Sequence, residues 1–279
     1  MKLSRRRRRP GYRRGCLAFA LLCIPVGRAQ GQPAAQDSED VAKKLTNPIA
    51  DMVSVPFQFN WENTVGPLHQ TRFVLNVQPV MPFSISTNWN MIARLIVPFV
   101  SQPPLFDGGA PTFGVADIAP SFFFSPKVSS FTWGIGPALS LPSSADPALG
   151  SGKWSGGPTV VMLKQGGGLT VGVLANQLWS FAGDAARTDI SQMFLQPFFA
   201  YQPTKSVTFA VNSESTANWK AVEDKWTVPI NFTASRLSSF GSFPASYKIG
   251  WGVFVAHPDI GPTWKLRSEI TLVLPRSSR

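Results

Sequence analysis

The chain has 279 residues, 44% of them hydrophobic, and a formal net charge of +11. Nine of its 26 basic residues lie within residues 1–29, where there is no acid, so the rest of the chain holds 17 basic and 15 acidic residues. This near balance argues against nucleic acid as a partner. No apolar run reaches the roughly 18 residues of a membrane-spanning helix.

Residues 1–29 have the pattern of a secretory signal peptide. A block of arginines precedes an apolar run over residues 16–26, and Gly27 and Ala29 are small residues at −3 and −1 of a cleavage site. Cleavage is predicted after Ala29. Both cysteines lie in this segment, so the exported chain is expected to have no thiol and no disulfide. A basic nucleic-acid-binding patch fits less well, because such patches are not normally followed by an apolar run.

Residues 30–52 are predicted to form a short leader before the first strand. Ser38 can cap one or two helical turns over residues 38–45, and Asn47-Pro48 should then stop the helix. The sequence leaves two placements open: the leader lies in the periplasm, or it plugs the pore.

Apolar and polar residues alternate in the segment that follows this leader. From Val53 to Trp61 every odd position is apolar, and the even positions hold polar residues and one proline. Successive side chains of a strand point to opposite faces, so the pattern predicts a strand with one apolar and one polar face. Its length of about ten residues is what a tilted strand needs to cross a bilayer.

The same alternation recurs along the chain, and stretches rich in Pro and Gly separate the repeats. Strands are predicted over residues 53–62, 71–81, 88–100, 114–125, 130–141, 158–165, 169–179, 190–201, 206–214, 225–235, 245–256 and 263–274. The segment 158–165 is the least clear, because its residues 160–163 are apolar on both faces. The connections after odd-numbered strands are mostly long and the others short, with 236–244 as the exception.

The predicted fold class is therefore all-β, a single transmembrane antiparallel β-barrel of about 12 strands over residues 53–279. An even strand number and connections that alternate in length are typical of bacterial outer-membrane barrels. Trp and Phe lie near strand ends, and isolated charges such as Arg72 and Arg94 lie on the polar face. Both features favour an inside-out arrangement, in which the apolar face of each strand points outward to lipid and the polar face points into the lumen. A soluble sandwich or lipocalin-like barrel is the alternative.

The run Ala42-Lys43-Lys44-Leu45-Thr46-Asn47-Pro48-Ile49-Ala50, followed by Ser54-Val55-Pro56-Phe57-Gln58, resembles the start of a bacterial outer-membrane barrel family. Its members are labelled transporters or MetA-pathway phenol-degradation proteins, and sometimes mislabelled neuromedin U. The resemblance implies a porin-like channel in the outer membrane of a Gram-negative bacterium. It also implies passage of small molecules, aromatic or apolar compounds among them. For an outer-membrane barrel we further expect contact with outer-membrane lipid and insertion by the barrel-assembly machinery. The resemblance transfers no catalytic motif.

Eight charged residues are predicted to face the lumen and are candidates for solute selectivity: Arg72, Arg94, Asp117, Glu214, Lys248, Lys265, Arg267 and Glu269. Fixed charges in a narrow pore bias which solutes pass. The other interpretation is that these charges pair and fill the lumen of a structural barrel, because buried charges need partners. Asp117 is a plausible partner for Arg94.

The two histidines, His69 and His257, are expected on the first and last external loops. This placement suggests an outer-membrane hydrolase as a further alternative. Catalysis would need a serine or aspartate oriented by a histidine, and no spacing in the sequence indicates one. Neither a metal cluster nor a cofactor motif is present, so we expect no enzyme activity, no metal and no cofactor.

Overall fold

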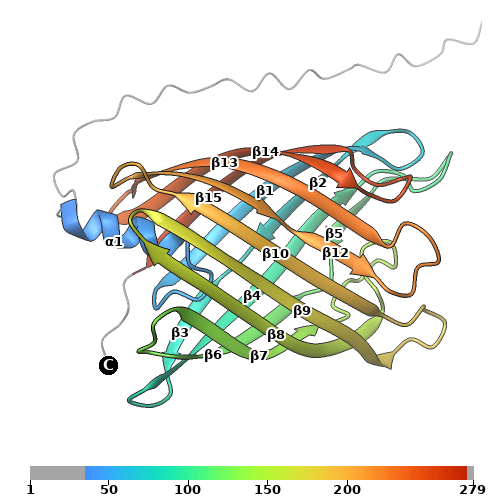
Figure 1. The fold of residues 1–279 in the computed structure, drawn as a ribbon. Coiled ribbons are helices and arrows are strands. Elements are labelled where there is room, and N and C mark those ends of the chain that lie inside the picture. Colours follow the sequence, from blue (N-terminus) through green and yellow to red (C-terminus); the bar gives the residue numbers. More distant parts are fainter. Residues whose placement is uncertain (1–34, 275–279) are drawn as a thin grey trace, which may run out of the picture. The chain divides into compact units, whose positions relative to one another are not determined.

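The computed structural model describes residues 35–274, which form one short helix and a closed antiparallel β-barrel (Figure 1). The elements are α1 (Ala35–Leu45), β1 (Val53–Val65), β2 (Gln70–Val77), β3 (Val80–Ser84), β4 (Trp89–Gln102), β5 (Thr112–Val115), β6 (Ala119–Pro126), β7 (Thr132–Ser140), β8 (Lys153–Gly166), β9 (Leu169–Gly183), β10 (Ser191–Tyr201), β11 (Val207–Ser213), β12 (Ser215–Asn218), β13 (Trp226–Phe240), β14 (Phe243–Ala256) and β15 (Trp264–Leu274). Among these residues no helix is long and apolar enough to span a membrane. The predicted signal peptide lies outside the described residues.

Three of the twelve wall strands are interrupted, which is why fifteen segments build a barrel of twelve. Segments β2 and β3 both pair with β1 and β4, β5 and β6 both pair with β4, and β11 and β12 both lie between β10 and β13. The first break contains Pro79, which has no N–H to donate to a neighbouring strand. The predicted barrel of about 12 strands is confirmed, and each predicted strand corresponds to one wall strand.

The sheet has no open edge, because the last strand pairs with the first. β15 runs antiparallel to β1 from Leu274 opposite Val53 to Trp264 opposite Asn63. The remaining junction, between β9 and β10, is equally continuous, from Tyr201 opposite Leu169 to Ser191 opposite Trp179. Closure of this kind gives every wall strand a hydrogen-bonded neighbour on both sides, so that no sheet edge is left to face the bilayer.

The outer surface of the barrel is apolar. Large hydrophobic side chains remain exposed along the strands, and on β14 they include Ile249 at 69% and Val255 at 64% of full exposure. The Phe232 and Trp251 rings stack on adjacent strands with centroids 6.2 Å apart. A soluble barrel would direct such residues inward, whereas an apolar outer band suits lipid. The inside-out arrangement predicted from the sequence is confirmed.

Strand β8 resolves the ambiguity of segment 158–165. Val161 and Leu163 are buried inside the barrel at 0% and 3% exposure, whereas Met162 between them is 46% exposed on the outside. Both faces are apolar because one meets lipid and the other meets an apolar part of the lumen. The expectation that the inner face is polar is therefore wrong for this part of the wall.

The two ends of the barrel differ in their connections. The longest connections, 103–111 and 141–152, lie at one end, and the tight turns 167–168 and 241–242 lie at the other. The expected long connection 236–244 is wrong: β13 continues to Phe240, and Gly241 turns the chain with φ of +60°. Short turns face the periplasm in barrels of this kind, which orients the molecule.

Helix α1 lies at the short-turn end (Figure 1). It begins at Ala35, three residues before the predicted start at Ser38, because Ala35 and Gln36 are good helix formers. It ends at Leu45, two residues before Asn47-Pro48, as expected. The Gln165 Nε2 group near the β8–β9 turn donates a 2.9 Å hydrogen bond to the Lys43 carbonyl, which holds the helix end against the barrel rim.

Phe57→Arg should destabilise the folded barrel, because Phe57 is on the lipid-facing side of β1. A basic residue on that face costs about 2–4 kcal/mol at mid-membrane and little near the interfaces. The urea unfolding midpoint in lipid vesicles measures the effect. Val128→Arg is the control, since Val128 is 91% exposed in a short turn. Equal midpoints for the two variants would contradict a lipid-facing Phe57.

Candidate functional site

The barrel encloses a cavity of about 560 Å³. This volume is within the range of about 300–1,000 Å³ that is usual for small-molecule sites. Its lining extends from Ser206, beside the short turns, to Ser140 and Thr216, near the long-connection end. The cavity therefore runs along much of the barrel, and the residues that surround it form the candidate site.

The segment between α1 and β1 narrows this cavity from the short-turn end. After α1, the Asn47 side-chain oxygen accepts a 2.9 Å hydrogen bond from the Ile49 amide, which folds the chain into a tight loop. The Thr46 hydroxyl forms a 2.8 Å hydrogen bond with the Thr170 hydroxyl on β9, and Gln165 donates to Thr46 at 2.9 Å. These contacts fix the loop to one side of the barrel mouth.

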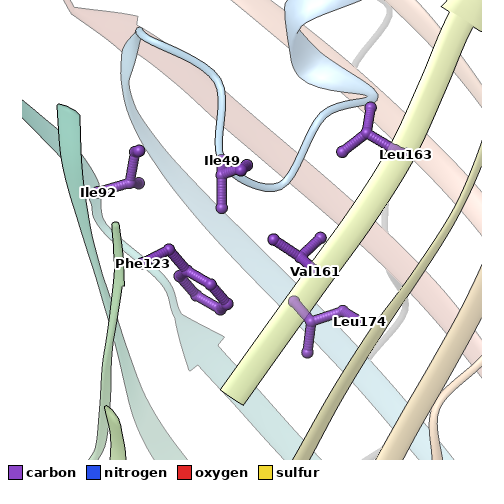
Figure 2. Close-up of a cluster of buried hydrophobic side chains, with 6 residues drawn as sticks. All are labelled: Ile49, Ile92, Phe123, Val161, Leu163 and Leu174. Atoms are coloured by element: carbon purple, nitrogen blue, oxygen red, sulfur yellow. The ribbon is translucent and has the colours of Figure 1, made fainter. Parts of the chain in front are cut away.

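Ile49 on this loop is buried among inward-pointing apolar side chains (Figure 2). It is 3% exposed, and its neighbours come from β4, β6, β8 and β9. We call this group the Ile49 cluster: Ile49, Ile92, Phe123, Val161, Leu163 and Leu174. The loop after α1 therefore lies inside the barrel mouth, against the apolar side of the lumen, whereas α1 itself stays at the rim. The cavity continues beside this loop.

The opposite wall carries a network of buried charges centred on Glu214. Glu214 lies in the break between β11 and β12, and its two carboxylate oxygens accept hydrogen bonds of 2.8 and 2.7 Å from the Arg267 guanidinium. Lys265 donates to the same carboxylate at 3.3 Å. Both cations come from β15, so the network reaches across β13 and β14. Gly252 on β14 leaves the room for this wall, because a Cβ there would lie 2.5 Å from the Asn231 side-chain oxygen and 3.2 Å from the Lys265 side chain.

A second ion pair, with a buried carboxylate and a half-buried lysine, continues this wall toward the short-turn end. The Lys248 ammonium lies 2.6 Å from the Glu269 carboxylate, which also accepts hydrogen bonds from Gln58 at 3.3 Å and Thr271 at 3.1 Å. Further toward the long connections, Arg72 pairs with Glu62 at 2.6 Å. Most of the predicted lumen charges are therefore paired, in residues that line the cavity or lie just beyond it.

Asp117 does not face the cavity, contrary to the prediction that it is a lumen-facing charge. Its carboxylate accepts hydrogen bonds of 2.7 and 2.5 Å from the backbone N–H and the hydroxyl of Ser151, so it anchors the 141–152 connection and does not line the cavity. The suggested pairing with Arg94 is wrong, because Asp117 lies in the interruption between β5 and β6, where the chain turns toward that connection.

Arg94 does line the cavity, as its place on the polar face of β4 predicts. Val80 on β3 and Ser121 on β6 are its cross-strand neighbours. Within residues 35–274 its guanidinium has neither a hydrogen bond nor an ion pair. The same holds for the ammonium of Lys44, which also lines the cavity.

The external connections are tied together by charged residues that the sequence did not single out. Lys153 at the start of β8 lies 3.0 Å from Asp189, and its hydrogen bond, followed by its positive charge, lowers the pKa of that exposed carboxyl group. Arg187 donates hydrogen bonds to the Ser151 carbonyl at 3.2 Å and the Pro147 carbonyl at 2.9 Å. The sequence gives no sign of these two roles, because each contact joins connections that are far apart along the chain.

The histidines provide no catalytic arrangement in the part of the chain that the structure describes. The His257 ring is 2.8 Å from the Pro258 carbonyl, and neither His257 nor His69 is hydrogen-bonded to a serine or a carboxylate there. Those residues also contain no group of three or more His, Cys, Asp or Glu side chains that could hold a metal ion. The hydrolase alternative therefore gains no support from the geometry.

A closed barrel with an apolar outer surface and a charged, partly open lumen defines the outer-membrane class of β-barrel proteins. The predicted location in the bacterial outer membrane is therefore confirmed. No protein-family model matches the sequence, and no curated protein matches it either.

Solved structures of an outer membrane channel and a porin share the fold. The COG4313 outer membrane channel from Pseudomonas putida F1 matches with a TM-score of 0.61 and 16% identity, over 80% of this chain and 96% of that one. The NanC porin matches with a TM-score of 0.50 and 10% identity, over 80% and 100%. Outer membrane phospholipase A from Escherichia coli matches with a TM-score of 0.45 and 10% identity, over 85% of this chain and 98% of that one. Such low identities establish the fold alone, so the phenol-degradation label is not confirmed.

Glu214→Gln should strongly destabilise the barrel, because it leaves Lys265 and Arg267, at 4% and 7% exposure, without their shared carboxylate. Removing one partner of a buried ion pair costs about 3–5 kcal/mol. The urea unfolding midpoint in lipid vesicles measures the loss. Glu39→Gln is the matched control, since Glu39 and Lys205 are 3.8 Å apart and largely exposed, so little change is expected. An unchanged midpoint for Glu214→Gln would rule out a structural role for the network.

Proposed function

We propose that the protein is a channel of the bacterial outer membrane that passes small molecules. The observation that carries this proposal is the cavity of about 560 Å³, which extends from the short-turn end to the level of Ser140 beside the Ile49 cluster. A barrel with a purely structural role gains nothing from such a space, because unfilled lumen volume forfeits packing contacts.

The lining of the cavity also indicates which kind of solute the channel would pass. One side is polar, with paired charges and amides such as Gln58 and Asn76, and the other side is apolar, with Leu174, Phe194 and Phe198. A two-sided lining suits small solutes that combine an aromatic or apolar part with a polar group. We therefore propose that aromatic compounds are among the solutes.

The filled, structural barrel is the second candidate, and specific contacts favour it. The Glu214 and Glu269 pairs occupy part of the lumen, and the loop that carries Ile49 narrows one end. Conductance of the purified protein in a planar bilayer separates the two functions. We expect discrete conductance steps, and a silent but correctly folded protein would favour the filled barrel.

Ile49→Ala should raise the conductance, because Ile49 is the side chain that packs the middle of the loop against the apolar wall. Truncating a buried isoleucine to alanine costs about 2–5 kcal/mol, and here that loss would loosen the part of the loop that narrows the lumen, while the Thr46 hydrogen bonds keep its start at the rim. The single-channel conductance of the variant measures this. Ile85→Ala is the matched control, since Ile85 is 51% exposed in the turn before β4. Unchanged conductance in Ile49→Ala would contradict a restricting role for the loop.

A further inference from the structure

Arg94 is an uncompensated charge in the wall of the cavity. Its cross-strand neighbours are an aliphatic residue, Val80, and a hydroxyl residue, Ser121. The rest of the described chain gives its guanidinium no carboxylate and no hydrogen-bond acceptor. A guanidinium has five donors and favours a planar anion that can accept two of them at once.

The acids that line the same cavity are already occupied. Glu214 binds Arg267 through two hydrogen bonds, and Glu269 lies 2.6 Å from Lys248. The charges of these pairs cancel. Arg94, together with Lys44 in the last turn of α1, therefore leaves the cavity with an excess of positive charge that favours an anion.

An apolar surface lines the cavity along with Arg94. Leu174 on β9 and the rings of Phe194 and Phe198 on β10 belong to the same lining, and the two rings also pack against the Ile49 cluster. The cavity therefore combines a free guanidinium on β4 with an aromatic wall on β9 and β10. Such a combination selects a ligand with an anionic end and an apolar body.

We propose that the cavity binds small aromatic monocarboxylates, with the carboxylate on Arg94 and the ring against Phe194 and Phe198. This proposal rests on the proposed channel function and adds to it a binding site and the charge of the solute. A neutral aromatic amide lacks the ion pair with Arg94. A short hydrophilic acid lacks the contact with the phenylalanine wall.

Isothermal titration of the purified full chain in detergent tests this proposal with three probes: sodium benzoate, benzamide and sodium acetate. Benzoate should bind at least about tenfold more tightly than benzamide, because charge-assisted hydrogen bonds are roughly twice as strong as neutral ones. Benzoate should also bind at least about tenfold more tightly than acetate, because acetate buries far less apolar surface. Equal binding of benzoate and benzamide would overturn the role of charge, and equal binding of benzoate and acetate would overturn the aromatic wall.

Variants at Arg94 locate the site. Arg94→Gln should weaken benzoate binding at least about tenfold, and Arg94→Lys should restore only part of it, because lysine keeps the charge without the two-pronged geometry. Arg236→Gln is the matched control: it removes the same charge from an exposed residue of β13 that does not line the cavity. Full-strength binding in Arg94→Gln, or an equal loss in Arg236→Gln, would overturn the assignment.

Folding and conduction are followed separately. Arg94 has no partner to lose, so Arg94→Gln should keep the wild-type shift in gel mobility on heating, and a lost shift would show instead that Arg94 supports the fold. Benzoate binding by a barrel that does not conduct would leave the anion site standing and remove the channel function. Conductance without benzoate binding would leave the channel function standing and overturn the anion site.

Discussion

The pairing of β15 with β1 is the constraint on which the rest of the structure depends. Without it, the N–H and C=O groups of two strands would face hydrocarbon, where each unsatisfied group costs several kcal/mol. Closure also turns one face of every strand outward, so Trp251 and Ile249 meet lipid while residues such as Arg267 meet the lumen. The same closure brings Asn60 on β1 within 2.7 Å of Arg267, so the buried charge network itself depends on it.

The lumen is divided into two chemically different sides, and this division explains both the loop and the cavity. The apolar side from β4 to β10 provides a surface on which Ile49 can be buried, which a fully polar lumen would not. The charged side cannot receive the loop, because Glu214 and Glu269 are already paired with cations. The loop therefore lies against the apolar side, and residues of both sides line the cavity that remains.

Alternation predicted the strands well wherever the two faces differ, as on β14. It failed on β8, because Val161 and Met162 are both apolar although one meets the lumen and the other meets lipid. The lumen-facing position of Arg94 follows from its register, but its lack of a partner does not. Pairing depends on which strands lie opposite and on interruptions such as the one at Asp117. Ile49 lies outside the alternating segments, so only the folded chain reveals its role.

Single-cysteine labelling along β13 tests the inside-out arrangement most directly. The natural cysteines, Cys16 and Cys23, fall within the predicted signal peptide, so Ser235→Cys and Phe232→Cys would each introduce a single thiol into the exported chain. Ser235 lines the cavity, and Phe232 is 47% exposed on the outer surface. In outer-membrane vesicles a hydrophilic maleimide should label Ser235→Cys and leave Phe232→Cys unlabelled. Labelling of Phe232→Cys with protection of Ser235→Cys would contradict the arrangement.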